Sequence, residues 1–350
     1  MGPGGGRQRP HGRGARAVRR LADWLLDAAP TSAGTYIMAT GIVSLGMMLA
    51  GQETIAEIVL AACAIGWLLL AVAFVHCLIA RPGELWASTA QLAALTAIAG
   101  TTVFGSALDI VLGWRLVPLI LWIVAAAGWI VVVARILTHL PRNLASGMIF
   151  LPAVATQGVS LLASSLSVAY EANWLLILAF GLWSAGILLY LFIGLPRFDF
   201  GRIIHGEGDQ WVLGGAVAIS ALAGGKLILA KEGLGMLAGI REQLLAAETI
   251  VWLVGISILP ILVGGELAYP RLQYHPSRWA TSFPVAMYAA STFVAATALG
   301  APWMNRYFSA WWVWVGLVVW VLTLTGLLRQ IARLASGRAA GPTSPSSSTT

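Results

Sequence analysis

Apolar residues along the chain gather into ten stretches of about 20 residues, each long enough to cross a bilayer as a helix. We expect these spans at 33–51, 55–80, 87–108, 116–137, 146–167, 174–195, 211–230, 245–267, 280–300 and 308–328. Ser, Thr, Asn and Gln are distributed unevenly: 23 lie in the odd spans and 6 in the even spans. Because a polar side chain in hydrocarbon is costly, the pattern predicts inner odd helices and lipid-facing even helices around a central pore.

Tryptophan follows the same alternation. Indole side chains occur within or at the ends of the even spans, at Trp67, Trp122, Trp129, Trp174, Trp183, Trp252, Trp311, Trp312, Trp314 and Trp320. Among the odd spans only the first residue of one, Trp211, is a tryptophan. We interpret the indoles as lipid contacts and an interfacial belt, since closely packed inner helices favour small residues.

Composition supports an all-α integral membrane protein. Hydrophobic residues make up 59% of the chain and charged residues only 10%, which excludes a soluble domain with an ordinary water-facing surface. Ten crossings take up about 200 residues, leaving no room for a sizeable soluble domain. The short connections predict antiparallel neighbours, so the ten transmembrane helices form five helical hairpins.

Charge predicts the topology. Apart from Lys226, sixteen Lys and Arg residues fall in the segments on the side of the N-terminus or at the span end that faces it, and four fall on the other side. This positive-inside bias predicts a multi-pass protein of the plasma (inner) membrane with cytoplasmic N- and C-termini, rather than a nucleic-acid partner. We expect a disordered basic tail at 1–15, an interfacial amphipathic helix at 16–30, a ten-helix transport domain at 31–333 and a disordered tail at 334–350.

Helix-breaking residues occur in the inner spans. Pro152 lies in the fifth span, Pro284 in the ninth, and glycine pairs at 214–215 and 224–225 in the seventh. Such positions free backbone carbonyls and are tolerated where they line a cavity or pack on neighbouring helices. The hydroxyl and amide groups of the third and fifth spans fit a pore lining, and they equally fit hydrogen bonds between helices.

Carboxylates are absent from all five odd spans, since Asp109 falls just past the third. Cation pathways and proton relays usually need such groups, so this absence favours an anion route. Lys226 is the only cation within an odd span, and either snorkelling or anion attraction explains it. The histidines lack metal-ligand spacing and no nucleophile pairs with a base, so we expect no metal, no cofactor and no enzymatic activity.

Three segments resemble the tellurite-resistance/dicarboxylate transporter family, which includes the slow-type anion channels of plant guard cells and malate and sulfite permeases. They are RWATSFPVAMY at 278–288, TGIVSLG at 40–46 and FLPAVA at 150–155. The resemblance covers roughly residues 30–330. It implies five hairpins around a quasi-fivefold axis, odd helices lining the pore, and a homotrimer with one pore per protomer.

The resemblance also implies a gate. A phenylalanine of the ninth helix occludes the family's pore, and at this motif position it is Phe283, followed by Pro284. An aromatic ring beside a helix break in a narrow pore is a plausible hydrophobic gate. If the ninth helix begins near Ser277, however, Phe283 lies only about 9 Å from its inner end, which is shallow for a mid-membrane gate.

The sequence therefore predicts transport of small inorganic or organic anions, including malate-like dicarboxylates, across a lipid bilayer. A proton-coupled dicarboxylate carrier, a sulfite or tellurite efflux protein, and a receptor or scaffold without flux are the alternatives. The candidate pore-lining residues are Thr40, Ser44, Gln91, Thr96, Thr101, Pro152, Thr156, Gln157, Ser160, Gly215, Lys226, Ser282 and Met287.

Overall fold

A computed structural model describes residues 33–138, 146–205, 208–234, 238–271 and 273–335, and every described element is a helix. The predicted tail at 1–15, the interfacial helix at 16–30 and all of the C-terminal tail beyond Ala335 lie outside these residues. After a first helix, Ala33–Leu49, the elements are α2 (Glu53–Ala80), α3 (Pro82–Ser88), α4 (Ala94–Leu112), α5 (Leu116–Thr138), η1 (Gly147–Phe150), α6 (Leu151–Ala169), α7 (Asn173–Leu189), η2 (Tyr190–Gly194), η3 (Leu195–Arg197), α8 (Gly201–His205), α9 (Trp211–Leu234), η4 (Ala238–Ile240), α10 (Arg241–Ala268), η5 (Pro276–Arg278), α11 (Trp279–Ala298), α12 (Pro302–Met304), η6 (Asn305–Ser309) and α13 (Ala310–Ala335).

Eight helices in the described residues are long and apolar enough to cross a membrane. The other two predicted spans are also helical, but each lacks one of these two properties. Ala33–Leu49 has too few described residues, and α11 has the length, at 20 residues, but too low a mean hydropathy. The polar groups that mark α11 as an inner helix also make it less apolar than an ordinary span.

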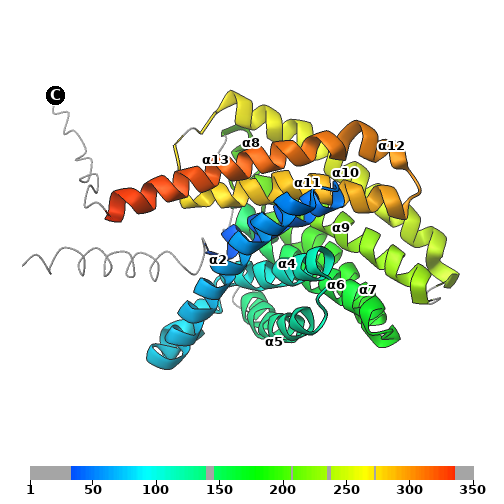
Figure 1. The fold of residues 1–350 in the computed structure, drawn as a ribbon, viewed down its shortest axis with the longest axis horizontal. Coiled ribbons are helices and arrows are strands. Elements are labelled where there is room, and N and C mark those ends of the chain that lie inside the picture. The colour runs from blue at the N-terminus through cyan, green and yellow to red at the C-terminus, as the bar shows by residue number, and fades with distance from the viewer. Residues whose placement is uncertain (1–32, 139–145, 206–207, 235–237, 272, 336–350) are drawn as a thin grey trace, which may run out of the picture.

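Burial separates the helices into two classes. The most apolar windows of α4, η1 with α6, and α9 are 72%, 94% and 89% buried, whereas those of the even-numbered predicted spans are 17–33% buried. We call Ala33–Leu49, α4, α6, α9 and α11 the inner helices, and α2, α5, α7, α10 and α13 the outer helices. In Figure 1, α4 and α6 lie within the bundle while α5 and α7 lie along its lower margin. The burial agrees with the inner and outer sets that polar content predicts.

The inner helices contact one another in a closed ring. Five approaches, made by residues of these helices or by the few residues directly before them, join each inner helix to the next and the last to the first: Gly34 with Thr96, Thr102 with Gly158, Gly147 with Asp209, Gly215 with Pro284, and Trp279 with Tyr36. The last pair is an edge-to-face contact with ring centroids 4.8 Å apart. Glycine supplies one side of four approaches, because the missing Cβ lets two helices pack closely.

These contacts also show that the inner helices are parallel. Their first turns meet at one end of the bundle, as in the pairs Gly34 with Thr96 and Tyr36 with Trp279. At the other end Asp109 of α4, Ser165 of α6 and Lys226 of α9 line one cavity. We call these the N-terminal and C-terminal ends of the inner bundle.

The third predicted span begins later than expected. Residues 82–88 form the separate helix α3, and α4 begins only at Ala94. Pro82 is at the start of α3, where a missing N–H costs little. At the end of α3 the hydroxyls of Ser88 and Thr89 donate to the Leu85 and Trp86 carbonyls, which competes with continuing the helix.

The expected helix breaks are not breaks in the structure. Pro152 is the second residue of α6, where no intrahelical hydrogen bond is lost. Helix α9 is continuous through both glycine pairs, and α11 is continuous through Pro284. The glycines serve close packing instead, since a Cβ on Gly215 would lie 2.7 Å from Pro284 Cγ.

Candidate functional site

The predicted gate lies where α11 packs on α9. Phe283 is 2% exposed, and its Cε1 lies 3.5 Å from the position that a Cβ on Gly215 would occupy. Ser282 and Met287, on the same part of α11, have no exposed surface. Among the described residues Ser282 Oγ has no hydrogen-bond partner. This group of residues is buried, closely packed and mostly apolar.

Phe283 is near the N-terminal end of the inner bundle. Helix α11 begins at Trp279, directly after the short turn η5, so Phe283 is only about 6 Å along the helix axis. The shallow position expected from the sequence therefore persists in the structure. A gate here would close the N-terminal end rather than the midpoint of the inner bundle.

Each outer helix donates a tryptophan N–H to the next inner helix. The acceptors of the Nε1 groups are Thr101 Oγ1 for Trp67 at 3.1 Å, Thr156 Oγ1 for Trp129 at 2.8 Å, the Ser220 carbonyl for Trp183 at 2.9 Å, Thr292 Oγ1 for Trp252 at 3.0 Å and Thr40 Oγ1 for Trp320 at 3.0 Å. Since the last bond joins α13 to the first helix, the series closes a circle. This repeated contact ties the outer layer to the inner ring.

The series corrects the interpretation of the tryptophans. Trp174 and Trp311 are exposed as a lipid-facing belt requires, but Trp122, Trp183 and Trp320 are buried. A buried indole N–H needs an acceptor, and the polar groups of the inner helices provide one. Inward-facing and outward-facing tryptophans have the same sequence signature because both types lie in the same apolar helices.

Several predicted pore-lining residues use their polar groups between helices. Thr40, Thr101 and Thr156 accept from tryptophans of outer helices. Other groups donate to outer-helix carbonyls: Ser44 to Ala56 at 2.8 Å, Gln157 to Trp183 at 3.0 Å and Ser160 to Ala179 at 2.7 Å. Thr96 donates to Ala93 in its own chain segment at 2.7 Å and lies against Gly34. These contacts join the layers.

Pairwise substitution of Trp320 and Thr40 measures how much one of these hydrogen bonds stabilises the protein. Trp320→Phe and Thr40→Val each remove one partner, and we expect a coupling of about 1 kcal/mol between them, the typical net value of a hydrogen bond. Thermal unfolding in detergent of both single variants and the double variant provides the measurement. Additive effects of the two substitutions would contradict a stabilising bond.

The remaining candidates are dispersed. Gln91 is exposed in the turn before α4, and Pro152 is buried at the start of α6. Gly215, Ser282 and Met287 lie with the predicted gate, whereas Lys226 lies at the opposite end of α9. The structure thus gathers three of these candidates at the gate and separates Lys226 from them.

A charged cavity opens at the C-terminal end of the inner bundle. Its volume is about 290 Å³, and it is lined by Asp109, Arg115, Ser164, Ser165, Val168, Ala169, Lys226, Leu229 and Ala230. Lys226 and Arg115 both interact electrostatically with Asp109. Two cations thus face one carboxylate, and Arg115 also donates to the Ala169 carbonyl at 2.7 Å. We call this cavity the vestibule.

A second charged cluster lies at the N-terminal end. Arg271 and Arg278 both pair with Glu266, at 3.1 Å from Arg278 Nη1 to the carboxylate, and Arg271 also donates to Thr281 Oγ1 at 3.2 Å. Burial, and then the like charge of Arg271, lower the pKa of Arg278, while Glu266 opposes the shift. Among the described residues Arg271 Nε, Arg278 Nη2 and Gln210 Nε2 are buried donors without an acceptor. Here too, two cations share one carboxylate.

The family model for voltage-dependent anion channels matches residues 29–328, most of the chain. The chain belongs to this family. No curated protein matches it significantly. Members of the voltage-dependent anion channel family are channels and transporters rather than enzymes, so membership indicates anion transport and is consistent with the expectation of no enzymatic activity. Among the residues that the structure describes, no group of three or more His, Cys, Asp or Glu side chains is arranged to hold a metal ion.

One buried acid of this anion channel family member was not expected from the sequence. Glu248 is on the outer helix α10, yet it has no exposed surface and faces the inner helix α9. Carboxylates were expected to matter only in the odd spans, and α10 is an even span. The available signal was an acid within a span, which suggests a function in whichever helix it occurs.

Proposed function

We propose that this protein conducts small anions or dicarboxylates such as malate through a passage between its five inner helices, closed by Phe283 and Pro284. The proposal includes ten crossings, arranged as five hairpins, in the plasma membrane with cytoplasmic termini, and assembly as a homotrimer. Family membership supports anion transport, and the gate follows from the motif at 278–288.

The observation that carries the proposal is the charge at the two ends of the inner bundle. Lys226 and Arg115 outnumber Asp109 in the vestibule, and Arg271 and Arg278 outnumber Glu266 at the N-terminal end. An excess of positive charge at each mouth raises the local concentration of anions and lowers that of cations. Both ends of the proposed passage therefore favour the same sign of ion.

Helix direction adds to this preference. The inner helices are parallel, so the positive ends of their dipoles meet at the N-terminal end, beside Arg271 and Arg278. The negative ends of α4 and α6 lie at the vestibule, where Lys226 and Arg115 offset them. An anion approaching from either side thus meets a net attraction.

Flux into liposomes tests this proposal. We expect the purified protein to pass chloride, nitrate, malate or sulfite and to exclude potassium, with the four anions compared at equal concentration. Substrate preference within the panel identifies the transported class. If a well-folded, reconstituted protein passed none of them, a membrane receptor or scaffold without flux would replace the transport proposal.

A coupled carrier is the second candidate. Glu248 favours it, because a buried acid in a membrane protein is typical of proton-dependent transport. A proton-coupled dicarboxylate carrier, or an efflux protein for sulfite or tellurite, would show saturable flux and accumulate its substrate against a gradient when a pH gradient is imposed. A channel would show neither property.

A further inference from the structure

Glu248 occupies an unusual place on an outer helix. Helix α10 is mostly exposed, as expected for a lipid-facing helix, but Glu248 has no exposed surface. Among the described residues neither carboxyl oxygen has a hydrogen-bond partner. An orphaned acid of this kind calls for a functional explanation, since buried polar groups are normally paired.

The residues around Glu248 offer its buried carboxyl group no hydrogen-bond donor. Its Oε2 lies directly against Gly224 of α9, in the space that a Cβ would fill, and Trp183 Nε1 of α7 lies 2.9 Å from the same position. The Trp183 N–H is already used by the Ser220 carbonyl. The neighbouring donor is therefore not available to the acid.

Other titratable groups on the helices around Glu248 face elsewhere. Lys226 is two residues beyond Gly224 on α9, and its electrostatic partner is Asp109 in the vestibule. On α11, the Tyr288 hydroxyl lies against Gly214, nearly three turns of α9 away from Gly224. Helix α7 presents Trp183, which does not titrate in this range. In the described part of the chain, Glu248 thus has no cation opposite it.

This buried setting favours the protonated, neutral form of Glu248 over the carboxylate. A buried carboxylate without a partner carries a large desolvation penalty, and the neutral acid carries a smaller one. The close packing of α10 on Gly224 therefore fits the neutral acid. Loss of the proton to water would favour an arrangement in which the carboxylate is hydrated, with α10 moved away from α9.

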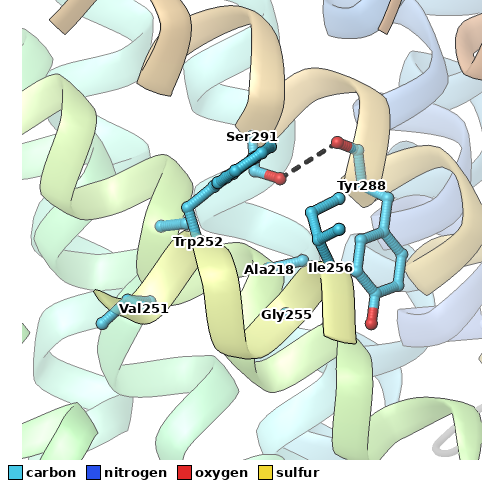
Figure 2. Close-up of a pocket in the computed structure, with 8 residues that line it drawn as sticks. Ala218, Val251, Trp252, Gly255, Ile256, Tyr288 and Ser291 are labelled. Carbon is cyan, nitrogen blue, oxygen red and sulfur yellow. Dashed lines mark hydrogen bonds between the residues drawn. The ribbon is translucent and has the colours of Figure 1, made fainter. Parts of the chain in front are cut away.

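The packing beside Glu248 leaves no space for a water molecule. One turn further along α10, a crevice lies between α10, α9 and α11, lined by Val251, Trp252, Gly255, Ala218 and Tyr288 among others (Figure 2). The Tyr288 hydroxyl points away from Ser291, whose hydroxyl donates to the Tyr288 carbonyl instead (Figure 2). Because this crevice is too narrow for a water molecule, hydration of the Glu248 carboxylate requires α10 and α9 to separate.

Helix α9 links Glu248 to the proposed gate. Gly224 packs against the acid, and Gly215, nine residues earlier on the same helix, packs against Pro284 and Phe283. A shift of α9 at Gly224 is transmitted along a continuous helix to Gly215. The position of the gate and the packing of the acid therefore depend on one rigid element.

We propose that Glu248 is a proton-binding site that controls anion flux. The neutral acid holds α10 on α9 with Phe283 packed against Gly215, and release of its proton to water moves α9 and opens the passage. This inference rests on the proposed function. It predicts that flux increases as the pH rises.

The test compares the protein with Glu248→Gln, which has the shape of the neutral acid but cannot ionise. We expect anion flux of the unsubstituted protein to rise about tenfold between about pH 5 and about pH 9, a range that includes the titration of buried acids. Glu248→Gln should keep the low flux at every pH. The matched control is Glu242→Gln, an exposed acid on the same helix, which should retain the pH response.

Two results would overturn the inference. The first is a pH response that Glu248→Gln leaves unchanged, and the second is anion flux that does not vary with pH in the unsubstituted protein. A readout independent of flux is the infrared band of a protonated carboxyl group, expected at neutral pH and lost in Glu248→Gln. Absence of flux with the band present would reject the proposed function and retain the proton site, whereas absence of the band rejects the proton site.

Discussion

Phe283→Ala is expected to raise anion flux about tenfold or more, since removing about 1.4 kcal/mol from a barrier gives a factor of about ten. The ring is buried against Gly215, and its truncation leaves space where the proposed passage is closed. A hydrophobic constriction excludes water as well as ions, so a wider opening lowers the barrier to water entry and the barrier to ion passage. Chloride flux into liposomes, normalised to reconstituted protein, measures the effect.

Truncation of a buried phenylalanine also destabilises, by about 3–5 kcal/mol. The matched control is Phe293→Ala on the same helix, where the side chain is only partly buried. Phe283→Leu, which retains most of the volume, should have intermediate flux. If Phe283→Ala were folded and conducted no more than the unsubstituted protein, the gate would have to lie elsewhere.

Opposite changes of flux are expected for two substitutions in the vestibule. Lys226→Gln should lower anion flux about fivefold and Asp109→Asn should raise it by a similar factor, since a unit charge about 8 Å away contributes about 1 kcal/mol at an effective dielectric constant of about 40. Both side chains line the same cavity, so one measurement of flux at low salt compares them directly.

Salt separates this effect from a change of fold. Both differences should shrink as ionic strength rises from about 0.01 M to about 1 M, because the Debye length falls from about 30 Å to about 3 Å. Lys226→Arg preserves the charge and should preserve flux, and Arg306→Gln, exposed on η6, serves as the surface control. Changes of the same sign for Lys226→Gln and Asp109→Asn would contradict attraction by charge.

Inner and outer helices could be distinguished from composition because hydrocarbon acts on each helix separately. A helix such as α2 faces apolar surroundings along most of its surface, so its residues must be apolar whatever its neighbours are. A helix such as α6 is 94% buried together with η1 and can keep Thr156 and Gln157. The polar content of each span therefore reports its layer without any knowledge of contacts.

The use of those polar groups could not be predicted in the same way. A hydroxyl on an inner helix fits a passage or a neighbouring helix equally well, and only the rotation of each helix decides between them. Thr101 and Thr156 bond to Trp67 and Trp129 in the outer layer. The same rotation places Trp183 inside the protein although its helix is mostly exposed.

The sequence by itself determined the membrane class, the two layers and the motif at Phe283, because these depend on local hydropathy and on residues adjacent in the chain. Only the tertiary structure decided which charges meet. Lys226 of α9 meets Asp109 and Arg115, from the end of α4 and the turn that follows it, in one cavity, and Glu248 turns inward from an outer helix onto Gly224. Helix rotation and close approach are set by the packing of all ten helices together, so no single span encodes them.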